Sequence, residues 1–263
     1  MTVSKWLTIV GVVAAIAAPR SECFAQQKWG SLKGQFVYDA ADAPKPDPLA
    51  IPGGVPAGCP NCKKTSDELL VDPDTKGVRN IVVYLMDEDG AIHPSYNALI
   101  EQPAVLDNKD CRFEPHVLAL WLKQPLRITN SDACGHNAAC SPKKEEPFNP
   151  LLQPKTDYVN RFAVPQTLPQ PVSCAIHPWM KGYVLPRATP YVAVTNAQGE
   201  FEIADLPAGQ HQFRVWHERA GYLLADPAWI VGRNKGVATW TIEADKTTDA
   251  GVIKVDPKLL APK

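Results

Sequence analysis

Short apolar runs separated by turn-forming residues make up the hydrophobic pattern of this chain. Apolar and polar side chains alternate over residues 31–38, and a continuous apolar run at residues 81–85 ends at the acidic turn 87–90. Residues 117–122 are apolar at every position, which indicates a strand buried on both faces. Twenty-six prolines fall mainly between such runs, and proline interrupts helices. The pattern therefore predicts an all-β fold without long helices.

After residue 190 the pattern becomes a regular alternation interrupted by glycine-bearing turns at residues 196–199 and 206–209. Short strands with such turns are typical of a β-meander. The strands expected there are residues 191–195, 200–203, 210–216, 237–242 and 252–255.

The first residues have the three-part plan of a secretory signal peptide. Lys5 precedes the apolar run 6–18, and a polar stretch then ends in the small residue Ala25. The run is too short to cross a bilayer comfortably, and no later stretch is long and apolar enough for a membrane helix. We expect cleavage after Ala25 and a periplasmic or secreted protein.

Charge excludes some partners. The chain has 27 basic and 28 acidic residues, and removal of the leader leaves 25 and 27, a net charge of −2. No basic stripe points to nucleic acid, and so small a net charge gives no strong field to steer a partner. Docking of a partner is expected to depend on local patches.

Candidate chemistry is concentrated in residues 174–180, where Cys174, His177 and Met180 recur at a three-residue spacing. Two histidines and one cysteine, with a weak axial methionine, form the blue-copper electron-transfer site. A second histidine must come from elsewhere, and His136 follows the strand-like run 125–130. The predicted copper ligands are therefore His136, Cys174, His177 and Met180.

Two other readings of the same stretch stay open. Cys174 and His177 could be half of a zinc site, although zinc makes little use of methionine. Cys174 could instead be one end of a disulfide. A haem attachment would need Cys-x-x-Cys-His, which the chain lacks.

The other cysteines of the exported chain are disulfide candidates, since an oxidising compartment favours disulfides. They are Cys59, Cys62, Cys111, Cys134 and Cys140. The Cys59-x-x-Cys62 pair could be a redox pair or half of a soft-metal site, but we favour structural disulfides, with one of the two bonded to Cys111. If Cys174 binds copper, five cysteines remain, and because five is an odd number they cannot all pair with one another.

Cys134 and Cys140 bracket the proposed ligand His136. We expect a disulfide between them that closes this loop and fixes the histidine. A free Cys134 near copper would instead offer a competing thiolate.

These residues resemble the cupredoxins, and the Cys-x-x-His-x-x-Met loop resembles that of their amicyanin-type members. The likeness includes the 130–132 turn and the Asn137 after the histidine, and it covers roughly residues 105–186. It implies a Greek-key sandwich with three ligands in one loop, an Asn137 that ties the two ligand loops together, and an apolar docking patch at Pro178 and Trp179. Within that family, the chain most resembles the cupredoxin-like proteins of bacterial cell envelopes, some of which are labelled methylamine-utilisation proteins.

Residues 196–209 resemble the carboxypeptidase regulatory-like family, a small transthyretin- or immunoglobulin-like β-sandwich without catalysis of its own. Asn196 stands where that family has Asp. Its first two strands are missing from this region, but suitable strands occur at residues 31–38 and 81–85. We therefore expect the copper domain to be inserted into a sandwich built from both ends of the chain. The expected parts are a signal peptide at 1–25, an N-terminal β segment at 26–104, a cupredoxin-like domain at 105–190 and a regulatory-like sandwich at 191–263.

The function expected from these observations is one-electron transfer between redox proteins of the cell envelope. The alternative is a non-catalytic module that binds an envelope partner or glycan, or that holds copper. A copper enzyme is not expected, because trinuclear copper sites need several His-x-His motifs and the chain has none.

Overall fold

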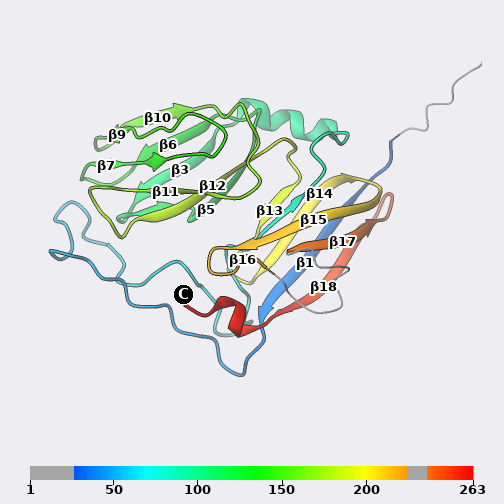
Figure 1. The fold of residues 1–263 in the computed structure, drawn as a ribbon, viewed down its shortest axis with the longest axis horizontal. Helices are drawn as coiled ribbons and strands as arrows, with labels where there is room; N and C mark the ends of the chain where they lie inside the picture. The colour runs from blue at the N-terminus through cyan, green and yellow to red at the C-terminus, as the bar shows by residue number, and fades with distance from the viewer. Residues whose placement is uncertain (1–26, 224–235, 263) are drawn as a thin grey trace, which may run out of the picture.

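The computed structural model describes residues 27–223 and 236–262, and these residues form two β-sandwiches that lie side by side (Figure 1). Helical structure in the described ranges is confined to the short 3-10 helices η1 (Pro94–Glu101) and η3 (Pro257–Leu260). The prediction of an all-β fold is confirmed. The expected signal peptide, residues 1–25, lies outside the described residues. Among those residues, no helix has the length and apolar character needed to cross a membrane.

The first sandwich is built from the middle of the chain and has two main sheets. One sheet has the order β10-β6-β3-β4, from Asp157–Asn160, Leu126–Asn130, Ala104–Lys109 and Arg112–Glu114. The other has the order β5-β12-β11-β8, from Val117–Trp121, Lys181–Arg187, Gln170–Ser173 and Ala139–Cys140. The short pair β7 (His136–Asn137) and β9 (Leu151–Leu152) lies at one end. Buried side chains such as Leu106, Leu126 and Val184 fill the space between the sheets.

The second sandwich contains strands from both ends of the chain. Its smaller sheet has the order β14-β1-β18, from Glu200–Pro207, Trp29–Tyr38 and Thr247–Val255. Its larger sheet contains β13 (Val192–Val194), β2 (Val82–Leu85), β15 (Gly209–His217), β16 (Gly221–Tyr222) and β17 (Val237–Ile242). Phe36, Val83 and Phe213 are fully buried between these sheets.

Strand pairing joins the two ends of the chain. β1 lies between β14, which it pairs antiparallel, and β18, which it pairs parallel. β2 pairs antiparallel with both β13 and β15. These are the pairings that the insertion hypothesis requires, since the whole first sandwich lies between β2 and β13 along the chain.

The two sandwiches pack through an interface that is part apolar and part charged. Tyr84, Tyr183 and Trp216 belong to a buried cluster shared by strands of both sandwiches. Beside it, His116 bonds to Glu218 at 2.6 Å, and both side chains are at least nine-tenths buried. This polar contact fixes how one sandwich sits on the other.

The long connection between β1 and β2 extends away from the second sandwich and runs along the first (Figure 1). Residues 39–81 form this connection, which carries Cys59 and Cys62. Cys59 is 1% exposed and belongs to the core of the first sandwich. The connection therefore places the sulfur atom of Cys59 at the end of the first sandwich where His136 lies.

Candidate metal centre

The loop that presents His136 is fixed by the Asn130 side chain at the end of β6. Asn130 Nδ2 donates to the backbone oxygens of Cys134 (2.9 Å) and Leu152 (3.0 Å), and its Oδ1 accepts from Asp132 N (3.0 Å). Asn130 is 2% exposed, so these bonds do not compete with water. The result is a rigid turn that ends with the fully buried His136.

Residues 174–180 form the loop between β11 and β12, and two backbone bonds close it. Met180 N donates to His177 O at 2.9 Å, and Cys174 N donates to Met180 O at 3.3 Å. The Cys174 sulfur accepts from His177 N at 3.4 Å. Because each predicted ligand bonds to another through the backbone, the loop holds all three in one geometry.

The structure brings His136, Cys174 and His177 together from two separate loops. His136 Nδ1 and His177 Nδ1 are 2.9 Å apart, and one ligand atom from each of the three residues lies within 4.8 Å of the others. All three side chains are buried, and Met180, 1% exposed, lies in the same core. Three of the four predicted ligands thus face one point, with the fourth buried beside them.

Proton positions in this group favour metal binding. Burial lowers the pKa of both His136 and His177, and for His136 the neighbouring Asp132 opposes that shift only in part. His136 Nε2 donates to Asp132 Oδ2 at 2.8 Å, so its Nδ1 carries a lone pair directed at His177. Two imidazole nitrogens with one thiolate are donors that suit copper.

Asn137 connects the two ligand loops, in the place that the cupredoxin resemblance implied. Its Oδ1 accepts from Ala175 N at 2.7 Å and from the Cys174 thiol at 3.3 Å. Its Nδ2 donates to Asn149 Oδ1 at 2.6 Å, which fixes the amide orientation. The backbone N–H of Asn137 also lies 3.5 Å from the Cys174 sulfur.

The proposed docking residues lie at the surface beside His177. Pro178 is exposed, whereas Trp179 is half-buried with its ring 5.2 Å from the His177 ring. Ile176, which the sequence did not single out, is 50% exposed in the same loop. The apolar surface nearest the site is therefore formed by Ile176 and Pro178 more than by Trp179.

Cysteine pairing follows the sequence expectation at one position and departs from it at another. Cys59 and Cys111 form a disulfide, as predicted for one of the Cys59-x-x-Cys62 pair. The expected Cys134–Cys140 disulfide is wrong, because both are free thiols, as are Cys62 and Cys174. Cys140 is in β8 and packs into the apolar core, where burial raises its pKa to about 12. The Cys134 sulfur points instead toward Cys59, 2.9 Å away.

Asp132 is the residue near the site that the sequence analysis missed. Its carboxylate accepts from His136, from Asp110 N (2.7 Å) and from Cys111 N (2.9 Å). The available signal was an acidic residue four positions before the predicted histidine ligand.

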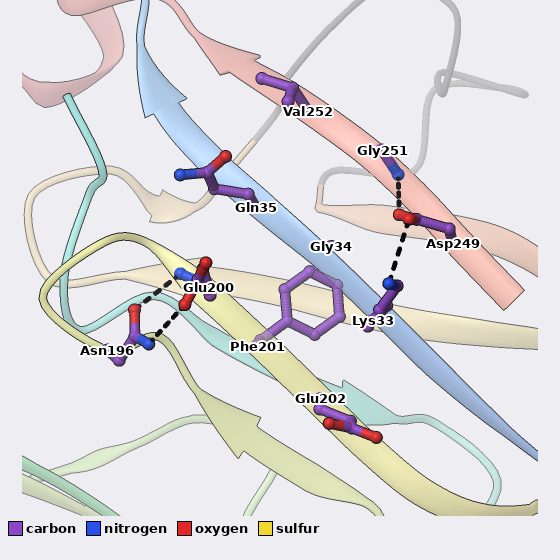
Figure 2. Close-up of a pocket in the computed structure, with 10 residues that line it drawn as sticks. All are labelled: Lys33, Gly34, Gln35, Asn196, Glu200, Phe201, Glu202, Asp249, Gly251 and Val252. Carbon is purple, nitrogen blue, oxygen red and sulfur yellow. Dashed lines mark hydrogen bonds and ion pairs between the residues drawn. The ribbon is translucent and has the colours of Figure 1, made fainter. Parts of the chain in front are cut away.

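A hollow with a volume of about 490 Å³ lies on the smaller sheet of the second sandwich, away from the candidate metal ligands (Figure 2). Its polar side chains are already paired: Lys33 of β1 pairs with Asp249 of β18 at 3.5 Å, and Asn196, in the turn before β14, donates to Glu200 at 2.9 Å. The Phe201 ring packs against Gly34, where a Cβ would lie 2.9 Å from it. These groups stabilise the sheet, and we assign them no ligand.

No protein-family model matches this chain, and no curated protein matches it. Solved structures similar to part of it include a copper-containing nitrite reductase from Thermus scotoductus SA-01, with 23% identity over 39% of this chain and a TM-score of 0.30. The chain spans only 25% of that reductase. A purple cupredoxin from Nitrosopumilus maritimus is 21% identical over 32% of this chain and 98% of its own, with a TM-score of 0.27.

An oxidised mutant of amicyanin is 17% identical over 40% of this chain and 98% of its own, with a TM-score of 0.30. Similarity at this level does not assign the chain to a family. A function for this chain therefore has to be argued from the geometry of the site. The resemblance to the carboxypeptidase regulatory-like family stays a prediction.

Proposed function

We propose that this chain is an exported copper protein that transfers single electrons between redox proteins of the cell envelope. The observation that carries the proposal is the convergence of His136, Cys174 and His177 in a buried site. His136, Cys174 and His177 would hold the metal, with Met180 as the weak axial ligand. Bound copper would supply the one-electron chemistry, because it can exist as Cu(I) and Cu(II).

The two ligand loops would serve electron transfer by holding the metal ligands in a fixed geometry. Loop closure between Cys174 and Met180 and the Asn130 and Asn137 hydrogen bonds hold the ligands in place. A site that cannot rearrange suits electron transfer, because no bond has to be made or broken by the protein when the charge changes. We propose no catalytic activity, and the leader expected at residues 1–25 supports an exported location.

The exposed apolar surface at Ile176 and Pro178 would be the contact through which electrons leave. It lies over His177, the ligand nearest the surface at 7% exposure. Weak redox encounters use small interfaces, which such a patch can provide. No specific redox partner is implied by these residues.

Electron self-exchange between copper-loaded molecules tests this assignment. Ile176→Lys places like charges opposite each other when two patches meet, so we expect the exchange rate measured by NMR line broadening to fall at least tenfold at low ionic strength and to recover with salt. Val252→Lys is the matched control, because Val252 is an exposed apolar residue of the other sandwich (61% exposed, against 50% for Ile176). Tight copper retention with no measurable exchange in the unmodified protein would instead indicate a copper-holding module.

A further inference from the structure

A second group of metal-binding atoms lies on the other side of the His136 ring. The Nδ1 edge of His136 faces His177, whereas its Nε2 edge faces Asp132 and Cys134. One ligand atom from each of Cys59, Cys111, Asp132, Cys134 and His136 lies within 4.8 Å of all the others. The Cys59 sulfur is 2.9 Å from that of Cys134 and 3.2 Å from Asp132 Oδ2.

Three separate parts of the chain are shaped to bring these atoms together. Cys59 comes from the long β1–β2 connection, Cys111 from the β3–β4 turn, and Asp132 and Cys134 from the loop after β6. In the β3–β4 turn, Asp110 and Cys111 adopt left-handed backbone angles (φ 54° and 53°), which non-glycine residues seldom do. The Asp132 carboxylate holds this turn by accepting from both backbone N–H groups.

The approach of Cys59 to Cys134 also depends on the residue before it. A Cβ at Gly58 would lie 2.6 Å from Cys134 Cβ and 2.9 Å from Cys134 N. Ala133 N donates to Gly58 O at 3.3 Å, so the two loops touch through their backbones. Glycine at this position is what allows the two sulfurs to meet.

A structural disulfide does not need this arrangement. The Cys59–Cys111 bond uses two sulfurs, yet a third thiol and a carboxylate are packed against the same sulfur. Reduction of the bond adds two electrons and two protons and leaves three thiols beside one carboxylate. With a phosphine reductant, water supplies the protons and the oxygen of the phosphine oxide that forms.

We propose that the reduced form of this cluster is a second metal site, in which Cys59, Cys111, Cys134 and Asp132 bind one zinc ion. Zinc takes four ligands in a tetrahedron, and three thiolates with a carboxylate are donors it accepts. At zinc–sulfur distances of about 2.3 Å, two sulfurs lie roughly 3.7 Å apart. The sulfurs of Cys59 and Cys134, now 2.9 Å apart, therefore have to separate, and those of Cys59 and Cys111 move apart once their bond is reduced. The three thiol protons leave to solvent as the metal binds.

Access and control follow from the same geometry. Cys134 is the one partly exposed member of the cluster, so an ion can enter from its side, whereas the other members are buried. Exchange with a disulfide oxidant, which takes up the two electrons and leaves as two thiolates, releases the zinc ion, rejoins Cys59 to Cys111 and closes the site. In the zinc-bound form, Asp132 would connect the zinc site to the copper site, because the carboxylate that binds zinc also accepts a hydrogen bond from His136.

Cobalt(II) binding tests this site without copper. We would use the full-length Cys174→Ser variant, which removes the thiolate of the first site, reduced with a phosphine and kept free of oxygen. One equivalent of Co(II) should give an intense sulfur-to-cobalt band in the near ultraviolet with tetrahedral bands in the visible, and one equivalent of Zn(II) should abolish both. Adding Cys134→Ala should weaken binding at least tenfold, whereas adding Cys140→Ser should leave it unchanged.

The oxidised Cys174→Ser protein should show none of these bands. The proposal is overturned if reduced protein with mapped Cys59 and Cys111 thiols binds no cobalt, or if the Cys134→Ala form binds cobalt as tightly as the Cys174→Ser protein does. Native mass spectrometry, with one zinc adduct expected on the reduced Cys174→Ser protein and a smaller fraction of adduct on the Cys134→Ala form, reports the same outcome independently of spectroscopy. Failure here leaves the copper assignment intact, since Cys174 is absent from every sample.

Discussion

His136 lies between the two candidate centres, because its Nδ1 faces His177 and its Nε2 faces Asp132. Asp132 fixes the proton on Nε2 and so leaves Nδ1 free to bind a metal. The same carboxylate holds the backbone of Asp110 and Cys111. One acidic side chain thus determines both the tautomer of the ligand and the position of a neighbouring cysteine.

Replacing Asp132 with asparagine should weaken copper binding by about 10–100-fold. The amide keeps one acceptor oxygen but has an NH2 donor in place of the other. With this donor facing His136 Nε2, the favoured His136 tautomer has its proton on Nδ1, the atom that would bind copper. Competition with a coloured chelator measures the affinity.

Asp157→Asn is the matched control, since Asp157 is an exposed acid that pairs with Arg127 and makes no contact with His136 or Cys174 in the described hydrogen bonds and ion pairs. Unchanged copper affinity in Asp132→Asn would show that the carboxylate does not orient His136.

At the scale of elements, the local patterns predicted the strands well. Alternation over residues 31–38 and the apolar run 81–85 correspond to β1 (Trp29–Tyr38) and β2 (Val82–Leu85). The spacing within residues 174–180 predicted that the three residues share one loop, because the backbone bonds that close this loop are local. Periodicity and loop spacing are properties of short stretches, so sequence alone reveals them.

The cysteine arrangement could be predicted only in part, because it depends on contacts between distant loops. Cys134 and Cys140 are close in sequence, yet β8 carries Cys140 into the core while Cys134 turns toward the β1–β2 connection. No local pattern indicates that the first part of the β1–β2 connection packs against the first sandwich and places Cys59 beside Cys134. Only the folded chain shows that three sulfurs meet behind His136.

At the scale of the whole molecule, the interface between the sandwiches depends on the buried carboxylate of Glu218. It receives hydrogen bonds from His116, from Lys181 (2.7 Å) and from Tyr183 (3.0 Å). Burial alone would raise the pKa of Glu218, but the bond to His116 and the neighbouring Lys181 outweigh it and lower the pKa to about 2. Lys181 directly follows Met180, so this contact also connects the ligand loop to the second sandwich.

The lowered pKa predicts how stability depends on pH. The ionised Glu218 contributes fully above the pKa of an unfolded glutamate, about 4.3, and the contribution is lost as the pH falls toward 2. Glu218→Gln should remove this dependence and lower the free energy of unfolding at pH 7 by about 2–4 kcal/mol, because His116 loses its buried partner. Urea denaturation between pH 7 and pH 2.5 measures both effects.

Glu243→Gln provides the comparison, since Glu243 pairs with Lys246 on the exposed surface, where ion pairs contribute little. Equal losses in the two variants would mean that Glu218 has no special role between the sandwiches.

If Cys174 and two histidines hold copper, the absorption spectrum of the purified protein after addition of Cu(II) will show it. We predict an intense visible thiolate-to-copper band in the unmodified protein and in Cys140→Ser, whose thiol is buried in β8 outside the site. The band should be absent in Cys174→Ser. An unmodified protein without this band, or a band that survives in Cys174→Ser, would contradict the account.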